Sequence, residues 1–413
     1  MEDKPRFDGW KMAVLCFCNV FIATGIGFST KSIYVSSFCD YYQMTRVTYS
    51  LIQSAGTILG AVVYVFYGAI VKKVGVKNSL CFGMLVTGTS KLILSFAPSL
   101  PIYSVAMVMG ATFYVFTSLG SVSQIVYNWF NEKRGLVLGV IYAASGLGGA
   151  FGSSILGKVL INTGWQAALK ITAFCIYGIA LVTWFTLIVS PSEVGQLPYG
   201  QKAGAKNTAA TGCEVKEGLR DYHFWLIVLG CIMMNFAQNA SYQNVSPHLQ
   251  AEGMDMGFIT SVVLVVTMCA NAASKPLMGI VNDKFSLRAS ILIPGISTIA
   301  GMFLMAGCGA DQPTLAIVSG GMIGFGTAIT TVAVSFLLTD LLGLKSYSYF
   351  IGIMNAVKYL GTTFGPLYAS SVFDKTGSYS FSYTVNSFVM AGAVIVLIAS
   401  TFNIRDYGQM EKD

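Results

Sequence analysis

The sequence predicts an all-α polytopic membrane protein with twelve transmembrane helices in two six-helix halves. The 413 residues are 54% hydrophobic and only 10% charged, whereas an average soluble domain carries about a quarter charged residues. Twelve apolar runs reach about 20 residues, the length that an α-helix needs to cross a bilayer. One long polar stretch divides these runs into six and six. This composition argues against a soluble fold, a disordered chain and a nucleic-acid-binding protein.

The first six spans are separated by short polar or helix-breaking segments. Pro98 and Pro101 separate the third span from the fourth, Gly164 separates the fifth from the sixth, and Pro191 follows the sixth. Proline and glycine at these points interrupt apolar helices. The expected spans are 10–36, 47–71, 78–97, 101–127, 136–160 and 166–190.

The second half follows a polar segment, 191–221, that is rich in charge, glycine and proline and has the composition of a mobile linker. We therefore expect an N-terminal half, 1–190, a cytoplasmic linker, 191–221, and a C-terminal half, 222–413. Pro247, Gly253, Pro313 and Gly377 punctuate the later spans. Those spans are 222–247, 257–281, 289–309, 313–340, 348–372 and 380–403.

The basic residues predict the orientation. When both termini, the linker and the even-to-odd loops are placed inside, 17 of the 25 Lys and Arg residues lie inside. Only Arg46, Lys158 and Lys375 then lie outside, as the positive-inside rule requires. We expect a multi-pass protein of the cytoplasmic (inner) membrane with both termini in the cytoplasm and the lipid bilayer as its surroundings.

The residues that catalysis or metal binding would need are not evident. The nine cysteines form no CxxC pair, and His223 and His248 are too few for a histidine metal site. The sequence contains no recognisable paired carboxylates, Ser/His/Asp set or nucleotide-binding loop. We therefore expect no catalytic residues, no metal and no cofactor, and predict that the protein is not an enzyme. Without a sizeable soluble domain, a receptor is also disfavoured.

A short motif recurs after the second and the eighth spans, at an offset of 211 residues. The copies read Gly68-x3-Lys72-Lys73-x-Gly75-x-Lys77 and Gly279-x3-Asp283-Lys284-x-Ser286-x-Arg288. Repeated six-helix halves are typical of transporters, and the motif resembles the loop motif G-x-x-x-D-[RK]-x-G-x-[RK] of the major facilitator superfamily. The resemblance implies gating roles for Lys73, Asp283, Lys284 and Arg288. Lys72 stands at the acidic position of the first copy, which argues against the usual gating salt bridge there.

Further stretches resemble the monocarboxylate transporter and oxalate/formate antiporter branch of that superfamily. Asp8-Gly9-Trp10 resembles its D-G-G-W stretch before helix 1, and Asn128-Trp129-Phe130-x-Glu132-Lys133-Arg134-Gly135 resembles the start of its helix 4–5 signature. The resemblance covers essentially the whole chain. It implies the major facilitator fold, with helices around a central cavity, a small organic anion as substrate, and a monomer.

Five lysines within the expected spans are candidate functional residues, because a buried charge is expensive in a membrane. Lys91 and Lys170 lie near enough to span ends to snorkel. Lys358 lies about ten residues, or ~15 Å, into its span, near the midplane, and is therefore a candidate substrate residue. Lys31 and Lys275 could snorkel, but Lys31 stands where the family has a substrate-linked lysine. Ser274-Lys275-Pro276 resembles the helix 8 arginine–proline step whose cation binds the substrate carboxylate.

Polar stripes supply the remaining candidates for substrate binding. Asn235, Gln238, Asn239 and Tyr242 fall at i, i+3, i+4 and i+7, on one helix face. Thr327 and Thr331 form a second stripe, and Phe28 lies beside Lys31. The resemblance implies that these helices line the cavity, and the alternative is ordinary helix–helix hydrogen bonding.

Asn271, one turn before Lys275, occupies the position where proton-coupled relatives carry an aspartate. An amide cannot titrate, and this favours exchange over proton symport. We therefore predict a secondary active transporter of mono- or dicarboxylates that works by alternating access, with exchange at a lysine-lined central site. The first alternative is a proton-coupled symporter of a larger amphipathic carboxylate, with a lysine as the titrating group. The second is a non-transport membrane receptor or enzyme.

Overall fold

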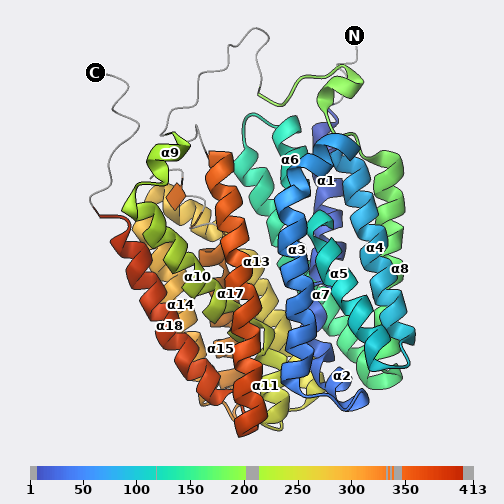
Figure 1. Cartoon of the computed structure of the whole chain (residues 1–413), viewed down its shortest axis with the longest axis vertical. Helices are drawn as coiled ribbons and strands as arrows, with labels where there is room; N and C mark the ends of the chain where they lie inside the picture. The colour runs from blue at the N-terminus through green and yellow to red at the C-terminus, as the bar shows by residue number, and fades with distance from the viewer. Residues whose placement is uncertain are drawn as a thin grey trace. The chain divides into compact units, whose positions relative to one another are not determined.

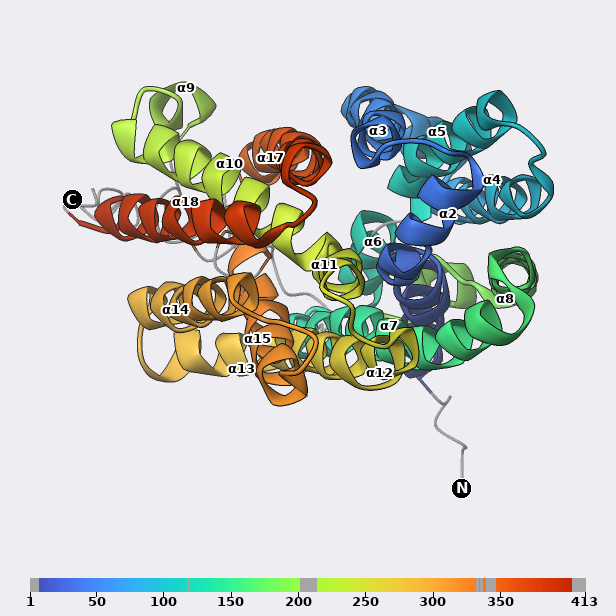
Figure 2. The same ribbon diagram turned by 90° about the horizontal axis from the view of Figure 1, so that it is seen from below.

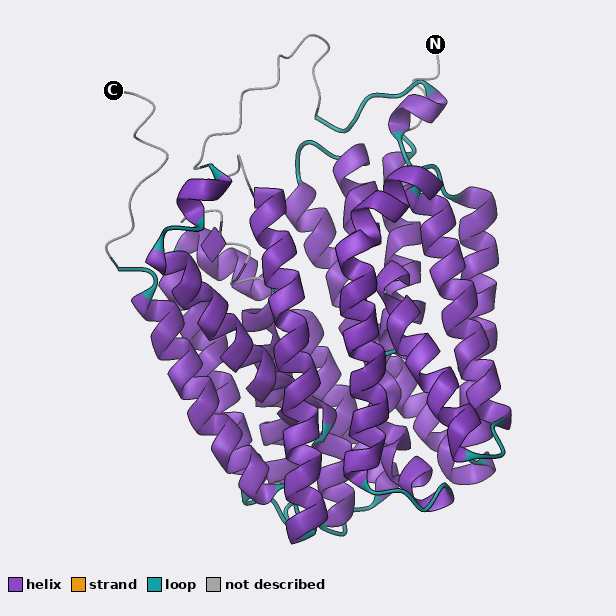
Figure 3. Cartoon of the chain, in the orientation of Figure 1, coloured by secondary structure: helices purple, strands orange, loops and turns teal. Residues whose placement is uncertain are grey.

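The computed structural model describes residues 7–117, 119–200, 214–331, 334, 337–338 and 347–402. Within these ranges the chain folds into helices joined by short loops, with no β-strand (Figure 3). Eleven of the described helices are long and apolar enough to cross a membrane. The prediction of an all-α polytopic membrane protein is therefore confirmed. Most of 332–340, the end of the tenth expected span, and 201–213 of the expected linker lie outside the described residues.

The eleventh expected span corresponds to α17 (Tyr347–Thr376), which has 30 residues and is long enough to cross a bilayer. It is not among the eleven apolar helices. Lys358, Asn355 and several hydroxyl residues lower its apolar content. The helix exists as expected, but its polarity sets it apart from the other spans.

The helical segments of residues 7–200 follow the expected order (Figure 1). They are α1 (Gly9–Asn19), η1 (Val20–Ile26), η2 (Ser29–Tyr34), α2 (Val35–Tyr41), α3 (Arg46–Val74), α4 (Val76–Phe96), α5 (Leu100–Thr117), α6 (Leu119–Trp129), α7 (Arg134–Thr163), α8 (Trp165–Thr186) and η3 (Pro191–Val194).

The segments after residue 213 are α9 (Val215–Gly218), α10 (Tyr222–Gln243), α11 (Val245–Ala251), α12 (Met256–Phe258), η4 (Ile259–Val263), α13 (Leu264–Lys284), α14 (Leu287–Ala306), α15 (Pro313–Gly326), η5 (Thr327–Thr330), α17 and α18 (Ser380–Ala399).

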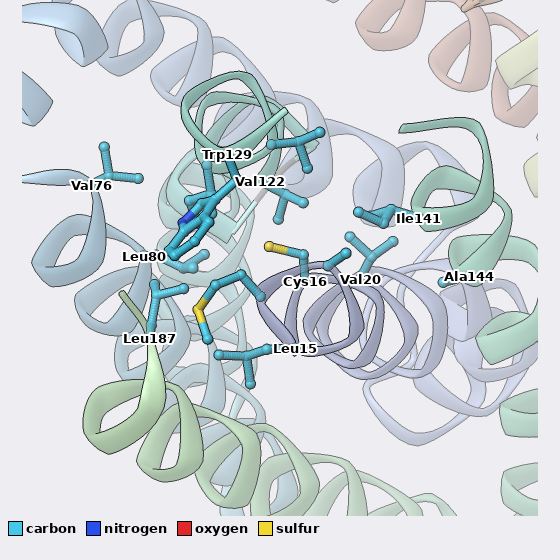
Figure 4. Packing of buried hydrophobic residues seen from close by; sticks show 14 of the residues in the cluster. Leu15, Cys16, Val20, Val76, Leu80, Val122, Trp129, Ile141, Ala144 and Leu187 are labelled. Atoms are coloured by element: carbon cyan, nitrogen blue, oxygen red, sulfur yellow. The ribbon is translucent and has the colours of Figure 1, made fainter. Parts of the chain in front are cut away.

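The chain divides into two compact units. Unit 1 comprises Met1–Ser37 and Ala55–Lys206, and unit 2 comprises Phe38–Ser54 and Asn207–Asp413. In unit 1, α4 packs against α5 and α8, and α7 packs along η1. A hydrophobic cluster joins α1, α6 and α7 around Trp129, Cys16 and Ile141, all of which are fully buried (Figure 4). Burying such side chains is the main packing contribution to unit 1.

In unit 2, α10 packs along α17 and α18, and α15 packs along α13 and α14 (Figure 2). Glycine permits the closest of these contacts. A Cβ atom on Gly361 of α17 would lie 2.7 Å from the carbonyl oxygen of Ile232 in α10. Small residues let membrane helices approach each other in this way.

Unit 2 also includes the first turn of α3. The carboxylate of Asp374, near the end of α17, accepts hydrogen bonds from the backbone N–H groups of Arg46 (3.1 Å) and Val47 (2.8 Å). The hydroxyls of Ser50 and Ser370 lie 2.6 Å apart. Negative charge at the first turn satisfies backbone donors that have no intrahelical partner.

Three of the expected spans contain π-helical or 3₁₀ segments. The first contains the π-helical turn η1, closed by a 2.8 Å hydrogen bond from Gly27 N–H to the Ile22 carbonyl, and then the 3₁₀ segment η2. The eighth contains the π-helical turn η4 and the tenth the 3₁₀ segment η5. Such irregular turns occur often at functional sites, and Lys31 lies in η2.

Candidate functional site

In unit 1, Lys31 belongs to an aromatic group. Its Nζ lies 4.1 Å from the ring centroid of Phe28. That ring stacks on Tyr114 of α5 with centroids 4.1 Å apart and planes 10° from parallel. The Tyr114 hydroxyl donates to Thr24 Oγ1 at 3.4 Å. A cation on an aromatic face is held electrostatically, so the break between η1 and η2 and the face of α5 together fix the lysine.

The two lysines that were expected to snorkel have different surroundings. Lys170 Nζ lies 4.2 Å from the ring centroid of Phe96. Lys91 lies close enough to Lys31 for the two positive charges to repel each other. Lys91 therefore belongs to the electrostatic surroundings of Lys31, whereas Lys170 has a local aromatic contact.

In unit 2, two of the predicted lysines interact. Lys275 of α13 is buried, with 7% of its surface exposed, and Lys358 of α17 is half-buried. The positive charge of Lys358 acts on Lys275 and also on Cys231 of α10. None of the ion pairs among the described residues involves Lys358. Two like charges in the apolar interior of one unit are unfavourable alone, and a bound anion would offset their repulsion.

Asn271 of α13 and Tyr242 of α10 form a hydrogen-bonded pair close to Lys275. The amide nitrogen of Asn271 donates to the Tyr242 hydroxyl at 3.1 Å, and Asn271 precedes Lys275 by one helical turn. The Asn271 Oδ1 atom is buried and makes no hydrogen bond. A buried acceptor without a donor is costly, and a protonated ligand group would satisfy it.

The other polar-stripe residues bond mainly within unit 2. Gln238 is buried, donates to the Ile323 carbonyl at 2.9 Å and accepts from Thr298 at 3.3 Å. These contacts match the alternative of helix–helix hydrogen bonding. Asn235 donates to its own helix at 2.8 Å, and the half-buried Asn239 donates to Asn235.

The predicted threonines bond within their own segment. The hydroxyl of Thr327 donates to the Gly324 carbonyl at 2.8 Å, and that of Thr331 donates to the Ala328 carbonyl at 3.4 Å. The glycines on this segment allow close packing, because a Cβ on Gly326 would clash with Thr298. The alternation of small and hydroxyl residues therefore serves helix contact as well as polarity.

The predicted gating residues lie at the ends of α3, α13 and α14. Lys73 and Lys284 are exposed in last turns. Arg288 donates from Nε to Thr401 Oγ1 at 2.9 Å and from Nη2 to the Thr401 carbonyl at 3.1 Å, so it holds the chain just after α18. The side chain of Asp283 lies outside the described part of the structure.

The two signature stretches bind the segment that follows α8. Trp129 donates from Nε1 to the Ile188 carbonyl at 3.0 Å, and its own carbonyl accepts from Tyr199 N–H at 2.8 Å. Asp8 and Gln196 exchange two hydrogen bonds, of 3.1 and 3.2 Å. We call residues 187–200 the strap. This contact was not predicted from the sequence, although the aromatic residues in and beside both stretches were a signal for it.

The Tyr199 ring is the centre of the strap's contact with unit 1. It lies 5.7 Å from the ring of Phe7, 5.9 Å from that of Trp10 and 6.1 Å from that of Phe130, measured between centroids. Aromatic pairs at these distances are attractive beyond the area they bury. The first ten residues of the expected linker are therefore packed on unit 1.

A family model, the major facilitator superfamily, matches residues 12–272 and 257–409. The chain belongs to the major facilitator superfamily. This confirms the resemblance inferred from the motifs. The named relatives are transporters rather than enzymes, as predicted.

Relatives within the superfamily include monocarboxylate transporter 13 of Bos taurus. It is 22% identical over 404 residues, which cover 95% of this chain and 90% of that protein. The oxalate:formate antiporter of Oxalobacter formigenes is 26% identical over 263 residues, covering 62% and 58%. Both relatives carry names from the branch that the motifs resemble.

Solved structures agree with the fold. A bacterial homologue of the human lysosomal transporter Spinster, inward-facing and unoccupied, has a TM-score of 0.70 at 13% identity, with 96% of each chain covered. A point mutant of the nucleoside transporter NupG has a TM-score of 0.71 at 12% identity, covering 94% of this chain and 100% of that one. The chain is thus a multi-pass membrane protein with the superfamily fold.

Proposed function

We propose that this protein is a secondary transporter of small organic anions, mono- or dicarboxylates, that operates by exchange. The observation that carries the proposal is the mutual repulsion of Lys275 and Lys358 within unit 2. A carboxylate between two ammonium groups neutralises charge that neither water nor the lipid interior can solvate well. The names of the relatives, monocarboxylate transporters and an oxalate:formate antiporter, support the same substrate class.

The charges also supply a reason for exchange. An empty carrier must move its cations through the occluded state without a counter-charge, whereas a loaded carrier moves them neutralised. The desolvation penalty of uncompensated charge is several kcal/mol per ion, so the empty transition is slow. Internal substrate is then released efficiently only when external substrate replaces it.

In unit 1, Lys31 is also proposed to bind substrate, with its Nζ held over the Phe28 ring. The proposed substrate-contacting set in unit 2 comprises Lys275, Lys358, Asn271 and Tyr242, with Asn239, Thr327 and Thr331 nearby on α10 and the tenth span. Gln238 fits this set less well, since hydrogen bonds within unit 2 occupy both its amide nitrogen and its amide oxygen. Asn235 donates to its own helix, but its Oδ1 atom is buried without a hydrogen bond and could meet a ligand donor.

The orientation of the chain in the membrane is part of the proposal. We propose that both termini and the segment 191–221 are cytoplasmic and that the protein works as a monomer in the cytoplasmic membrane, with functional halves 1–190 and 222–413. The distribution of lysine and arginine supports this orientation. Lys73, Lys284, Asp283 and Arg288 would then lie on the cytoplasmic side, where a gate is required.

Proton-coupled symport of a larger carboxylate is the competing mechanism. Asn271 argues against it, because the amide beside Lys275 cannot carry a proton. A symporter would accumulate its substrate when an inward proton gradient is imposed, without any internal substrate. An exchanger would not.

The test uses the full chain in proteoliposomes loaded with a radiolabelled acid such as oxalate, formate, lactate or malonate. We expect efflux to accelerate at least tenfold when the same acid is added outside, and to be insensitive to an imposed proton gradient. Neutral and cationic solutes serve as controls for the substrate class. Efflux that is equally fast into substrate-free buffer would refute exchange, and selective transport of a neutral or cationic solute would refute the anion proposal.

A further inference from the structure

His248 is a buried histidine with one unfilled ring nitrogen. Its Nε2 lies 2.9 Å from the Met305 carbonyl, and because a carbonyl only accepts, Nε2 must carry the hydrogen. Its Nδ1 is buried and makes no hydrogen bond. It faces Glu252 Oε1 at 3.7 Å, too far for a hydrogen bond. In the neutral imidazole the Nδ1 lone pair therefore faces a carboxylate.

The other histidine of the chain provides a contrast. His223 Nδ1 lies 2.7 Å from Asp221 Oδ1, and its Nε2 lies 3.0 Å from the Phe402 carbonyl. Both nitrogens of His223 thus meet acceptors, whereas only one nitrogen of His248 does. The two histidines have similar burial and differ mainly in this respect.

His248 joins three segments at the end of unit 2 that lies away from residues 214–221. It belongs to α11, it bonds to Met305 near the end of α14, and its ring lies 5.0 Å from that of Tyr383 in α18. Glu252, at the end of α11, accepts a 2.6 Å hydrogen bond from Ser378 Oγ in the loop before α18. We call this group of contacts the α11 corner.

The charged and titratable groups around the α11 corner come from several elements. Besides Glu252, Asp311 follows α14 and acts on Cys308, while Arg46 and Asp374 act on Tyr379. Burial raises the pKa of the Cys308 thiol and of the Tyr379 phenol, so both are neutral at physiological pH. Tyr383 donates its hydroxyl hydrogen to the Ser241 carbonyl at 2.8 Å. Glu252 is then the carboxylate that a protonated His248 would meet directly.

We propose that His248 is a proton-binding site that loosens the α11 corner when it is occupied. A proton added at Nδ1 creates an imidazolium in a fully buried position. At 3.7 Å, Glu252 forms an ion pair with it but accepts no hydrogen bond from it unless one of the two groups moves. Relief comes from a shift of α11 or of the loop before α18. Either movement disturbs the Met305 or the Ser378 contact. The inference does not depend on the identity of the transported solute.

The direction of the pH effect follows from burial. Desolvation lowers the pKa of His248, while its hydrogen bond to Met305 and the charge of Glu252 act in the opposite direction and are smaller. The unfolded chain, with an ordinary histidine pKa near ~6.5, therefore takes up the proton first. Stability is fully present above that pH and falls as the pH drops below it, until the folded pKa is reached. Each pH unit within this window changes the unfolding equilibrium by up to about tenfold.

The test measures the thermal unfolding midpoint, Tm, of the purified full chain from pH 8 to pH 5.5. We expect the Tm of the wild type to fall with pH. In His248→Gln, whose amide can still donate to Met305, the fall should shrink. His223→Gln is the matched control and should retain it. An unchanged fall in His248→Gln, or its disappearance in His223→Gln, would overturn the proposal.

Glu252→Gln keeps the test decisive if His248→Gln does not fold. The negative charge of Glu252 favours the protonated form of His248 in the folded protein. Without that charge, the fall in Tm between pH 8 and pH 5.5 should be larger than in the wild type. Hydrogen exchange, corrected for its intrinsic pH dependence, should be faster at pH 5.5 in residues 245–251 and 376–379 than at pH 7.5. The inference would be contradicted if the Tm of Glu252→Gln fell with acid no more than that of the wild type. Hydrogen exchange that is equally fast at both pH values in these segments would also contradict it.

Discussion

Replacement of Lys358 by alanine tests the proposed anion site most directly. The substitution removes one of two interacting cations from unit 2 and leaves Lys275 in place. On the proposed function it should weaken substrate binding without unfolding the protein. The apo protein should be as stable as the wild type or more stable, because a half-buried positive charge and its repulsion of Lys275 both disappear.

The expected magnitude follows from the charges. A carboxylate about 4 Å from an ammonium group gains roughly 4 kcal/mol at an effective dielectric constant of 20. Removing one partner of a buried charge pair typically costs about 2–5 kcal/mol. An estimate of ~3 kcal/mol corresponds to roughly 150-fold weaker binding.

The assay is titration of the purified protein with the acid that gives the largest thermal shift, with Kd and apo Tm determined in parallel. Lys170→Ala is the matched control, since that lysine has a local contact with Phe96. Lys358→Arg should restore part of the affinity by restoring the charge. A Kd within threefold of the wild type in Lys358→Ala, or equal weakening in Lys170→Ala, would refute the reasoning. A large fall in apo Tm would instead assign Lys358 a structural role.

Three further predictions concern separate parts of the molecule. Asn271→Asp places a carboxylate beside Lys275, so affinity for the acid should fall about tenfold, ~1.4 kcal/mol, at pH 7.5 and recover as the new carboxyl is protonated; titrations between pH 5 and 7.5 check this. Gly365→Ala forces a Cβ into the backbone of α10 and should cost about 1–3 kcal/mol, seen as a lower Tm, whereas Gly178→Ala meets nothing within 4 Å and should not lower it. Tyr199→Ala removes the ring at the centre of the strap, and glutamyl endopeptidase should then cut the strap several-fold faster; an unchanged rate would contradict the role of that ring.

Hydropathy predicted the fold because the bilayer imposes a length and an apolar content on each span. The interruptions within spans were not predicted. A π-helical turn such as η1 keeps the same residues in the same order and changes only which carbonyl each N–H reaches, so a hydropathy window does not detect it. Gly27 allows the irregular backbone there, because a Cβ atom would lie 2.5 Å from the Ala23 carbonyl oxygen, but glycine is also common in regular membrane helices.

The site was predictable in part because a charged residue within an apolar span is rare. A lysine near the middle of a span is conspicuous, and Lys358 stood out for that reason alone. Its interaction with Lys275, 83 positions earlier in the sequence, depends on the tertiary arrangement of unit 2 and not on sequence spacing. The stripe containing Gln238 had the right period for a cavity face, yet a contact with α15 requires the same period. Periodicity alone does not separate the two.

Unit 2 holds two groups of titratable residues that cost stability: Lys275 with Lys358, and His248 with Glu252. A sequence selected only for stability would replace Lys358 and His248 by apolar residues, because an uncompensated charge or an unfilled nitrogen in a buried position costs free energy. An anion between the lysines removes the first cost. The second depends on pH, because a proton at Nδ1 fills the nitrogen but leaves a buried positive charge. The stability of unit 2 is therefore tied to the solutes around it. On the proposed function, that dependence is what a carrier needs, since the arrangement that moves must differ in free energy between its loaded and empty forms.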